Sequence, residues 1–189
     1  MTQENSSNNH KLFIDGDEVL ATPLTCTASN WPIVANNLKI KWVDIDPTTL
    51  NMDLEDLERK ITPKTKAIMG VHWGGYPLDL DEIRNIRGRF RQEHGWAPAL
   101  IEDGAHSIGT KYKGKYLGNH HNFVMNSLQA IKHITSVDGG LLYCPHDELY
   151  ERAKLLRWYG IDRNPKGRTD FRCEADIEER GFKFHMNDV

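Results

Sequence analysis

The order of apolar and polar positions in the first half of the chain predicts strands that alternate with helices. Short apolar or alternating runs predict four strands, at 19–21, 38–43, 66–72 and 99–102. Apolar residues at helical spacing predict helices within 25–37, over 53–61 and from 80 to about 95. Because strand and helix alternate at short spacing, the pattern indicates an α/β fold with a mostly parallel, doubly wound sheet and flanking helices.

The second half of the chain has a less regular pattern. It predicts a small hairpin at 111–116, strands at 123–126 and 139–144, and a helix at 147–158. Residues 1–10 are polar and rich in Asn and Ser, so we expect them to be disordered. No internal repeat or low-complexity linker follows them.

Composition excludes several classes of protein. The chain has 39% hydrophobic and 27% charged residues, which is typical of a soluble globular protein, and its net charge of −3 without a basic stripe gives no reason to expect nucleic acid. It has neither the apolar core of a secretory signal nor a run of membrane-spanning length, so we expect a cytoplasmic protein. Its three cysteines are far apart, which favours reduced thiols over a disulfide framework.

Two turns carry the candidate chemistry. The apolar run before Asp103 ends in a small-residue turn with His106, which predicts that Asp103 lies at the carboxyl end of a buried strand, where open α/β sheets bind ligands. Ser127 and Lys132 lie in a second such turn. A carboxylate that holds a ring nitrogen and a lysine that bonds to an aldehyde are what pyridoxal phosphate requires.

Each of these residues also has a simpler interpretation. A single lysine on a loop is usually solvated, and an Asp at a strand end more often caps a turn than binds a cofactor. His120, His121 and His133 suggest a metal, but no carboxylate or thiol at ligand spacing accompanies them. We therefore expect no metal site. Asp103 and Lys132 indicate a cofactor site only when they are considered together.

Several motifs in order resemble one family. They are Glu102-Asp103-Gly104-Ala105-His106, 127–132, Asp138-Gly139-Gly140 and 181–188. From about residue 11 to its end, the chain is similar to the DegT/DnrJ/StrS aminotransferases. The resemblance implies the large domain of a fold-type I enzyme that depends on pyridoxal phosphate. It also implies transfer of an amino group from an amino acid such as glutamate to a nucleotide-linked keto-sugar.

The resemblance assigns a role to each matching residue. Lys132 stands where the family has the lysine that forms a Schiff base with the cofactor and moves the substrate proton. Asp103 matches the acid that pairs with the pyridinium nitrogen, and His106 matches a residue near the ring oxygen. Ser127 matches a serine that contacts the phosphate.

Two further site positions depart from the family pattern. Cys26 stands where many relatives have an aromatic side chain that stacks on the cofactor ring, and sulfur also makes favourable contacts with an aromatic face. Lys183 stands where relatives commonly carry an Asn that reaches the phosphate in the neighbouring subunit, and a lysine meets a phosphate as a point charge. The resemblance thus implies a homodimer with shared sites.

The resemblance covers only the central part of the family's large domain. Relatives begin with a segment whose helix N-terminus holds the cofactor phosphate, and they continue into a small C-terminal domain. We therefore expect residues 11–189 to be a partial cofactor-binding domain, truncated at both ends.

Two alternatives to an aminotransferase remain. The first is a deoxysugar-modifying enzyme of the same fold. Its known dehydratase branch replaces the lysine with His, so Lys132 argues against that branch, and His133 lies one position too late. The second is a catalytically incomplete fragment with an interaction or remnant role.

Overall fold

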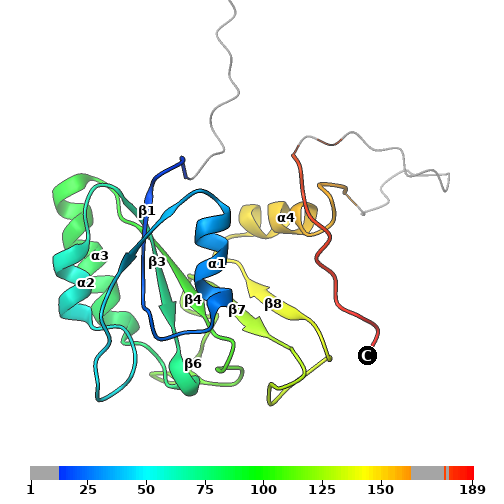
Figure 1. The fold of residues 1–189 in the computed structure, drawn as a ribbon. Helices are drawn as coiled ribbons and strands as arrows, with labels where there is room; N and C mark the ends of the chain where they lie inside the picture. Colours follow the sequence, from blue (N-terminus) through cyan, green and yellow to red (C-terminus); the bar gives the residue numbers. More distant parts are fainter. Residues whose placement is uncertain (1–12, 163–176, 178) are drawn as a thin grey trace, which may run out of the picture. The chain divides into compact units, whose positions relative to one another are not determined.

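The computed structural model describes residues 13–162, 177 and 179–189 of the chain (Figure 1). They form two compact units, one ending at Asp103 and the other beginning at Gly104. The disorder predicted for residues 1–10 falls outside the described residues.

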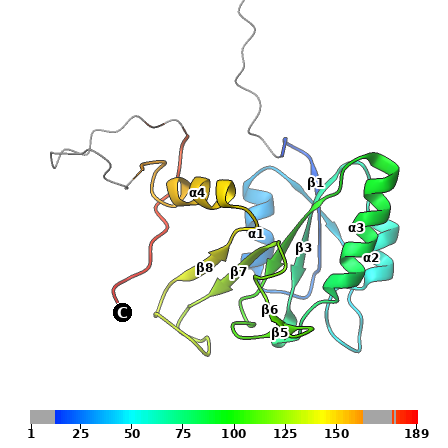
Figure 2. The ribbon, with the colours of Figure 1, turned by 180° about the vertical axis from the view of Figure 1, so that it is seen from behind.

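The first unit is built on four parallel strands in the order β2-β1-β3-β4. These strands are β1 (Glu18–Ala21), β2 (Lys39–Trp42), β3 (Thr65–Val71) and β4 (Ala99–Asp103). The helices are α1 (Thr27–Ala35), α2 (Leu54–Lys60) and α3 (Leu80–His94), with a 3-10 turn η1 (Trp73–Gly75). Figures 1 and 2 show α1 on one face of the strands and α2 with α3 on the other, which confirms the doubly wound α/β prediction.

The core of the first unit lies between its strands and helices. Leu20 and Ile68 of the two central strands are fully buried, and α3 turns Ile83, Ile86 and Phe90 inward. This is the apolar face predicted from the helical spacing. By contrast, Trp42 is 47% exposed although β2 alternates, because β2 is the outer strand of the four.

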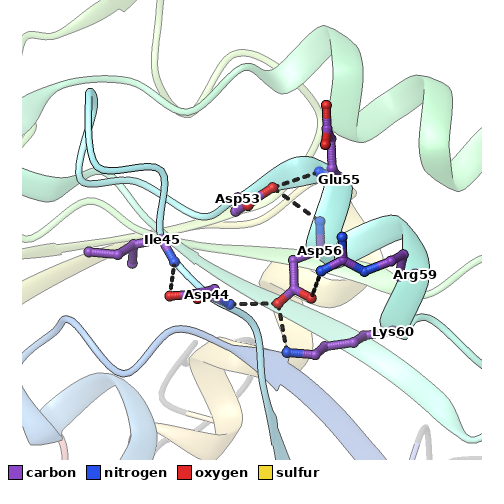
Figure 3. A network of polar contacts seen from close by, with 7 residues as sticks. All are labelled: Asp44, Ile45, Asp53, Glu55, Asp56, Arg59 and Lys60. Atoms are coloured by element: carbon purple, nitrogen blue, oxygen red, sulfur yellow. Dashed lines mark hydrogen bonds and ion pairs between the residues drawn. The ribbon is translucent and has the colours of Figure 1, made fainter.

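Acidic residues determine where α2 begins (Figure 3). The Asp53 side chain accepts hydrogen bonds from the N–H groups of Glu55 and Asp56, so it caps the helix. The buried Asp56 carboxylate binds Lys60 and Arg59, each at 2.6 Å, and also accepts the Asp44 N–H at 2.8 Å. This network joins α2 to the end of β2.

The second unit contains a hairpin, an antiparallel strand pair and a helix. The elements are β5 (Lys111–Tyr112), β6 (Lys115–Tyr116), β7 (Phe123–Ser127), β8 (Gly140–Tyr143) and α4 (Asp147–Leu156). The hairpin turns through Lys113 and Gly114, both at positive φ, as a two-residue turn requires. β7 and β8 pair antiparallel, and all four residues of β8 are exposed. None of the described helices is long and apolar enough to cross a membrane.

The segment 179–189 is bonded to the end of α4. Trp158 and Lys183 form an isolated antiparallel bridge, and the Arg152 guanidinium binds both carboxylate oxygens of Glu179, at 2.9 and 2.6 Å. Gly160 and Gly181 make the close approach possible, because a Cβ on Gly181 would lie 2.4 Å from the Gly160 nitrogen. The last motif of the chain is thereby fixed to the second unit.

Candidate active site

Asp103 is the last residue of β4, at the carboxyl end of the parallel strands, as predicted. Its Oδ2 lies 2.5 Å from the Ser29 hydroxyl, which donates to it from the first turn of α1. Ser29 is only 2% exposed, and the Thr25 hydroxyl lies 2.7 Å from it. The candidate carboxylate is therefore held by side chains from a segment 74 residues away along the chain.

The backbone of Asp103 is held by a different residue, His72. Its carbonyl accepts the His72 N–H at 3.0 Å. The His72 ring is locked in turn, because its Nε2 lies 2.8 Å from Glu102 Oε2 and its Nδ1 accepts the Leu78 N–H at 3.1 Å. Both side chains of the His72–Glu102 pair are completely buried. The end of β4 is thus fixed through both the backbone and the side chain of Asp103.

Cys26 directly precedes α1 and is exposed. It has the extended backbone of a helix N-cap, but its side chain makes no capping hydrogen bond. Because Ser29 lies one turn further along α1 and binds Asp103, the structure places the Cys26 residue at the start of the helix that holds this carboxylate. Ser29 was not predicted as a site residue, because nothing in the sequence around it indicates a contact with a carboxylate 74 positions away.

His106 lies in the turn that opens the second unit and is exposed. The turn is folded tightly around Gly104, whose N–H donates to the Met125 carbonyl at 2.7 Å and whose carbonyl accepts from Asn126 and Ser107. A Cβ at Gly104 would lie 2.6 Å from Asn126 Nδ2. A larger residue at this position of the motif would therefore displace the Asn126 and Ser107 side chains that bind the turn.

Ser127 and Lys132 bracket one compact turn between β7 and β8. The Lys132 N–H donates to the Gln129 carbonyl at 2.9 Å, and the Gln129 N–H donates to the Ser127 hydroxyl at 3.3 Å. The Lys132 side chain is half-buried. His133 Nε2 donates to the Ile108 carbonyl at 3.1 Å, which ties this turn to the turn of His106.

Asn187 closes the same loop from the end of the chain. Its Nδ2 donates to the Ser136 carbonyl at 2.6 Å and to the Asp138 carbonyl at 3.1 Å. The Ser136 N–H reaches back to Leu128 at 2.9 Å, so the loop of Lys132 is bonded at its base. Asn187 was part of a motif recognised in the sequence, but no role was predicted for it.

Lys183 lies on the C-terminal segment, with its Nζ 5.6 Å from the centre of the Trp158 ring. It lines a cavity of about 810 Å³ formed by β8, α4 and residues 183–186. Lys154 and Arg157 line the same cavity beside apolar side chains such as Leu142 and Phe184. Among the described residues, no group of three or more His, Cys, Asp or Glu side chains is arranged to hold a metal ion.

Each unit by itself offers side chains of the kinds that pyridoxal phosphate needs. A carboxylate fixed by a hydroxyl can hold a protonated ring nitrogen, and a half-buried primary amine can bond to an aldehyde. The Ser127 hydroxyl can donate to a phosphate. Asp103 and Ser29 belong to the first unit, and Ser127, Lys132 and His106 belong to the second.

Comparison with known proteins agrees with this chemistry. The model of the DegT/DnrJ/EryC1/StrS aminotransferase family matches residues 9–189. The structure of AtS13 from Actinomadura melliaura is 55% identical, with a TM-score of 0.85 over 90% of this chain and 45% of that chain. The sugar aminotransferase CalS13 from Micromonospora echinospora is 46% identical, with a TM-score of 0.80 over 88% of this chain and 44% of its own.

A third solved structure carries the cofactor. It is a GDP-4-keto-6-deoxymannose-3-dehydratase with a trapped PLP-glutamate geminal diamine, 32% identical over 81% of this chain and 38% of that chain, with a TM-score of 0.74. The chain spans less than half the length of each of these three solved proteins.

Proposed function

Because the chain belongs to the DegT/DnrJ/EryC1/StrS aminotransferase family, we propose that its protein is a sugar aminotransferase dependent on pyridoxal phosphate. It would take an amino group from an amino acid such as glutamate and transfer it to a nucleotide-linked keto-sugar. The observation that carries this proposal is the carboxylate of Asp103, held by Ser29 at the end of β4, in a chain that also presents Lys132 in a hydrogen-bonded turn.

In this proposal, five side chains named from the sequence hold the cofactor. The Asp103 carboxylate accepts a hydrogen bond from the protonated ring nitrogen, and the Ser127 hydroxyl donates to the phosphate. His106 lies beside the ring oxygen, Cys26 packs on the ring face, and Lys183 meets the phosphate of a neighbouring subunit's site. Pyridoxal phosphate, when bound, supplies an electron sink for the negative charge left on a substrate carbon that loses a proton.

Lys132 performs the proton transfers. With the cofactor bound, the Lys132 Nζ would be the amine that holds its aldehyde carbon, with loss of water, until an amino acid takes its place. As a free amine, Lys132 would accept the proton that leaves the substrate carbon and would hold it for return. The same nitrogen works in the reverse direction when the keto-sugar receives the amino group. Asp103 meanwhile keeps the proton on the ring nitrogen, which preserves the electron sink.

We also propose that the protein is a homodimer and acts in the cytoplasm. Large apolar side chains of the second unit support a partner surface, among them Leu142 at 48% and Phe184 at 65% exposed. Light scattering of the purified protein at several concentrations tests the dimer. A mass equal to one chain at every concentration would contradict it.

A covalent trapping experiment tests the function. The purified chain is incubated with pyridoxal phosphate, reduced with borohydride and digested, and the modified peptide is mapped by mass spectrometry. We expect modification confined to Lys132 and lost in Lys132→Ala. The control is Lys64→Ala, which removes an exposed lysine from the first unit and should leave the modification in place. Scattered or absent modification would contradict the proposal, and specific modification justifies assays with glutamate and keto-sugars.

A further inference from the structure

We propose that Ser29 is a positioning residue for Asp103: its hydroxyl fixes the carboxylate in the orientation that meets the ring nitrogen of pyridoxal phosphate. The inference rests on the proposed function and adds a residue to it. It starts from the short contact between Ser29 Oγ and Asp103 Oδ2, at 2.5 Å. A hydroxyl that donates to a carboxylate belongs to the stronger class of hydrogen bond in proteins.

The direction of the hydrogen bonds follows from the number of protons. A serine hydroxyl has one proton, and an ionised carboxylate can only accept. The Ser29 proton therefore points to Asp103, and the Thr25 hydroxyl, 2.7 Å away, must donate to Ser29. The result is a one-way chain from Thr25 through Ser29 to Asp103. Donation by Thr25 polarises the Ser29 hydroxyl and strengthens its bond to the carboxylate.

The Asp103 side chain needs such a contact because of where it lies. Its backbone is fixed by β3 and by the His72 N–H, but these are bonds of the main chain and do not set the orientation of the carboxylate. The Ser29 hydroxyl acts on that orientation directly, since it binds the Oδ2 oxygen of the carboxylate. Ser29 is 2% exposed and sits on a helix, so it has little freedom of its own. A carboxylate held this way is ready before the cofactor arrives.

A purely structural role for Ser29 predicts something different. If the hydroxyl only satisfied a half-buried carboxylate, its removal would weaken folding and would lower affinity for any cofactor that fills the site. If it positions Asp103, the loss appears only when the ligand has a ring nitrogen for Asp103 to hold. The two roles are therefore separated by an analogue of pyridoxal phosphate in which a carbon replaces the ring nitrogen.

The experiment measures dissociation constants for pyridoxal phosphate and for this deaza analogue by equilibrium titration of the full chain. We expect Ser29→Ala to weaken binding of pyridoxal phosphate about tenfold, the effect of one hydrogen bond to a charged group, and to leave binding of the analogue unchanged. Ser29→Thr, which keeps the hydroxyl, should restore the affinity. Thr25→Val should weaken the binding of pyridoxal phosphate less than Ser29→Ala does, because it removes no contact to Asp103 itself.

The matched control is Thr65→Val. Thr65 is completely buried at the start of β3, and its hydroxyl accepts the Thr62 N–H at 3.0 Å, at the opposite end of the strand from His72. The Thr65→Val variant tests how the loss of any buried hydroxyl affects ligand binding. We expect it to leave the ratio of the two dissociation constants unchanged. In an Asp103→Ala background, Ser29→Ala should have no further effect on the affinity for pyridoxal phosphate.

Different failures have different meanings. If Ser29→Ala weakens the binding of both ligands equally, or changes the affinity for neither, the positioning role is overturned while the proposed function stands. If the unmodified chain binds pyridoxal phosphate no better than Lys132→Ala does, the proposed function fails and takes this inference with it.

Discussion

His72 and Glu102 form a completely buried pair in which the imidazole Nε2 lies 2.8 Å from the carboxylate Oε2. Because His72 Nδ1 accepts the Leu78 N–H, the proton of the neutral ring must be on Nε2, where it is donated to Glu102. Glu102 and Asp103 are neighbours on β4, so this pair fixes the strand that ends in the candidate carboxylate. The pair belongs to the framework under the site and not to the site surface.

Breaking this pair should be costly. We expect Glu102→Leu to lower the free energy of unfolding by about 3 kcal/mol, because the buried His72 Nε2–H would lose its acceptor. Urea denaturation followed by circular dichroism measures the change. The control is Glu58→Ala, which breaks the exposed pair with Arg89 at 2.7 Å and should cost less than about 1 kcal/mol. Equal effects of the two variants would mean that the buried pair contributes no more than a surface pair.

The lowered pKa of Asp56 predicts how the stability of the protein depends on pH. Burial alone would raise the pKa of Asp56, but hydrogen bonds from Lys60, from the Asp44 N–H and from Arg59 outweigh it and hold the pKa at about 2 (Figure 3). The folded pKa is therefore below the unfolded value near 3.9, so the stabilisation is complete above pH ~4 and is lost as the pH falls toward 2.

The corresponding variant is Asp56→Asn. Because Arg59 and Lys60 reach solvent, we expect a loss of about 1 to 2 kcal/mol at neutral pH that shrinks as the pH falls from about 4 to 2. Urea denaturation at a series of pH values measures it. A stability difference between the two proteins that stays constant across this range would contradict the assignment.

Gly104 and Gly88 provide a matched pair of glycines. A Cβ at Gly104 would lie 2.6 Å from Asn126 Nδ2 and 2.8 Å from Ser107 Oγ, so we expect Gly104→Ala to destabilise the protein by about 1 to 3 kcal/mol. A Cβ at Gly88, on the exposed side of α3, meets no atom within 4 Å. Gly88→Ala should therefore stabilise the protein by up to about 1 kcal/mol. Thermal unfolding of the two variants should shift in opposite directions.

Asn187 should control the mobility of the Lys132 loop. Asn187→Asp keeps the shape of the side chain but removes the donor that binds the Ser136 and Asp138 carbonyls. We expect faster amide hydrogen exchange in residues 128–139, measured by mass spectrometry. Asn36→Asp changes an exposed amide at the end of α1 and should leave this loop unaffected. Unchanged exchange in the Asn187 variant would show that the loop is held by other bonds.

Much of the fold was predictable because its signals are local. The apolar face of α3, the acidic start of α2 and the glycine turn of the 111–116 hairpin each require only neighbouring residues. The strand ends were also predictable, since an apolar run that stops at Asp103 fixes the position of that residue without reference to the rest of the chain. The family motifs added the predicted roles of Lys132 and Ser127, which stay predictions.

The sequence by itself therefore determined the order of the elements, the doubly wound class and the placement of Asp103 at the end of a strand, because periodicity and turn residues act over a few positions. Tertiary structure alone decided the partners. Ser29 reaches Asp103 across 74 positions, His72 reaches Glu102 across 30, and Asn187 reaches Ser136 across 51. Such contacts form only after the parallel strands and the C-terminal segment have packed, because hydrogen bonds between distant residues depend on their final positions in space and leave no pattern along the chain.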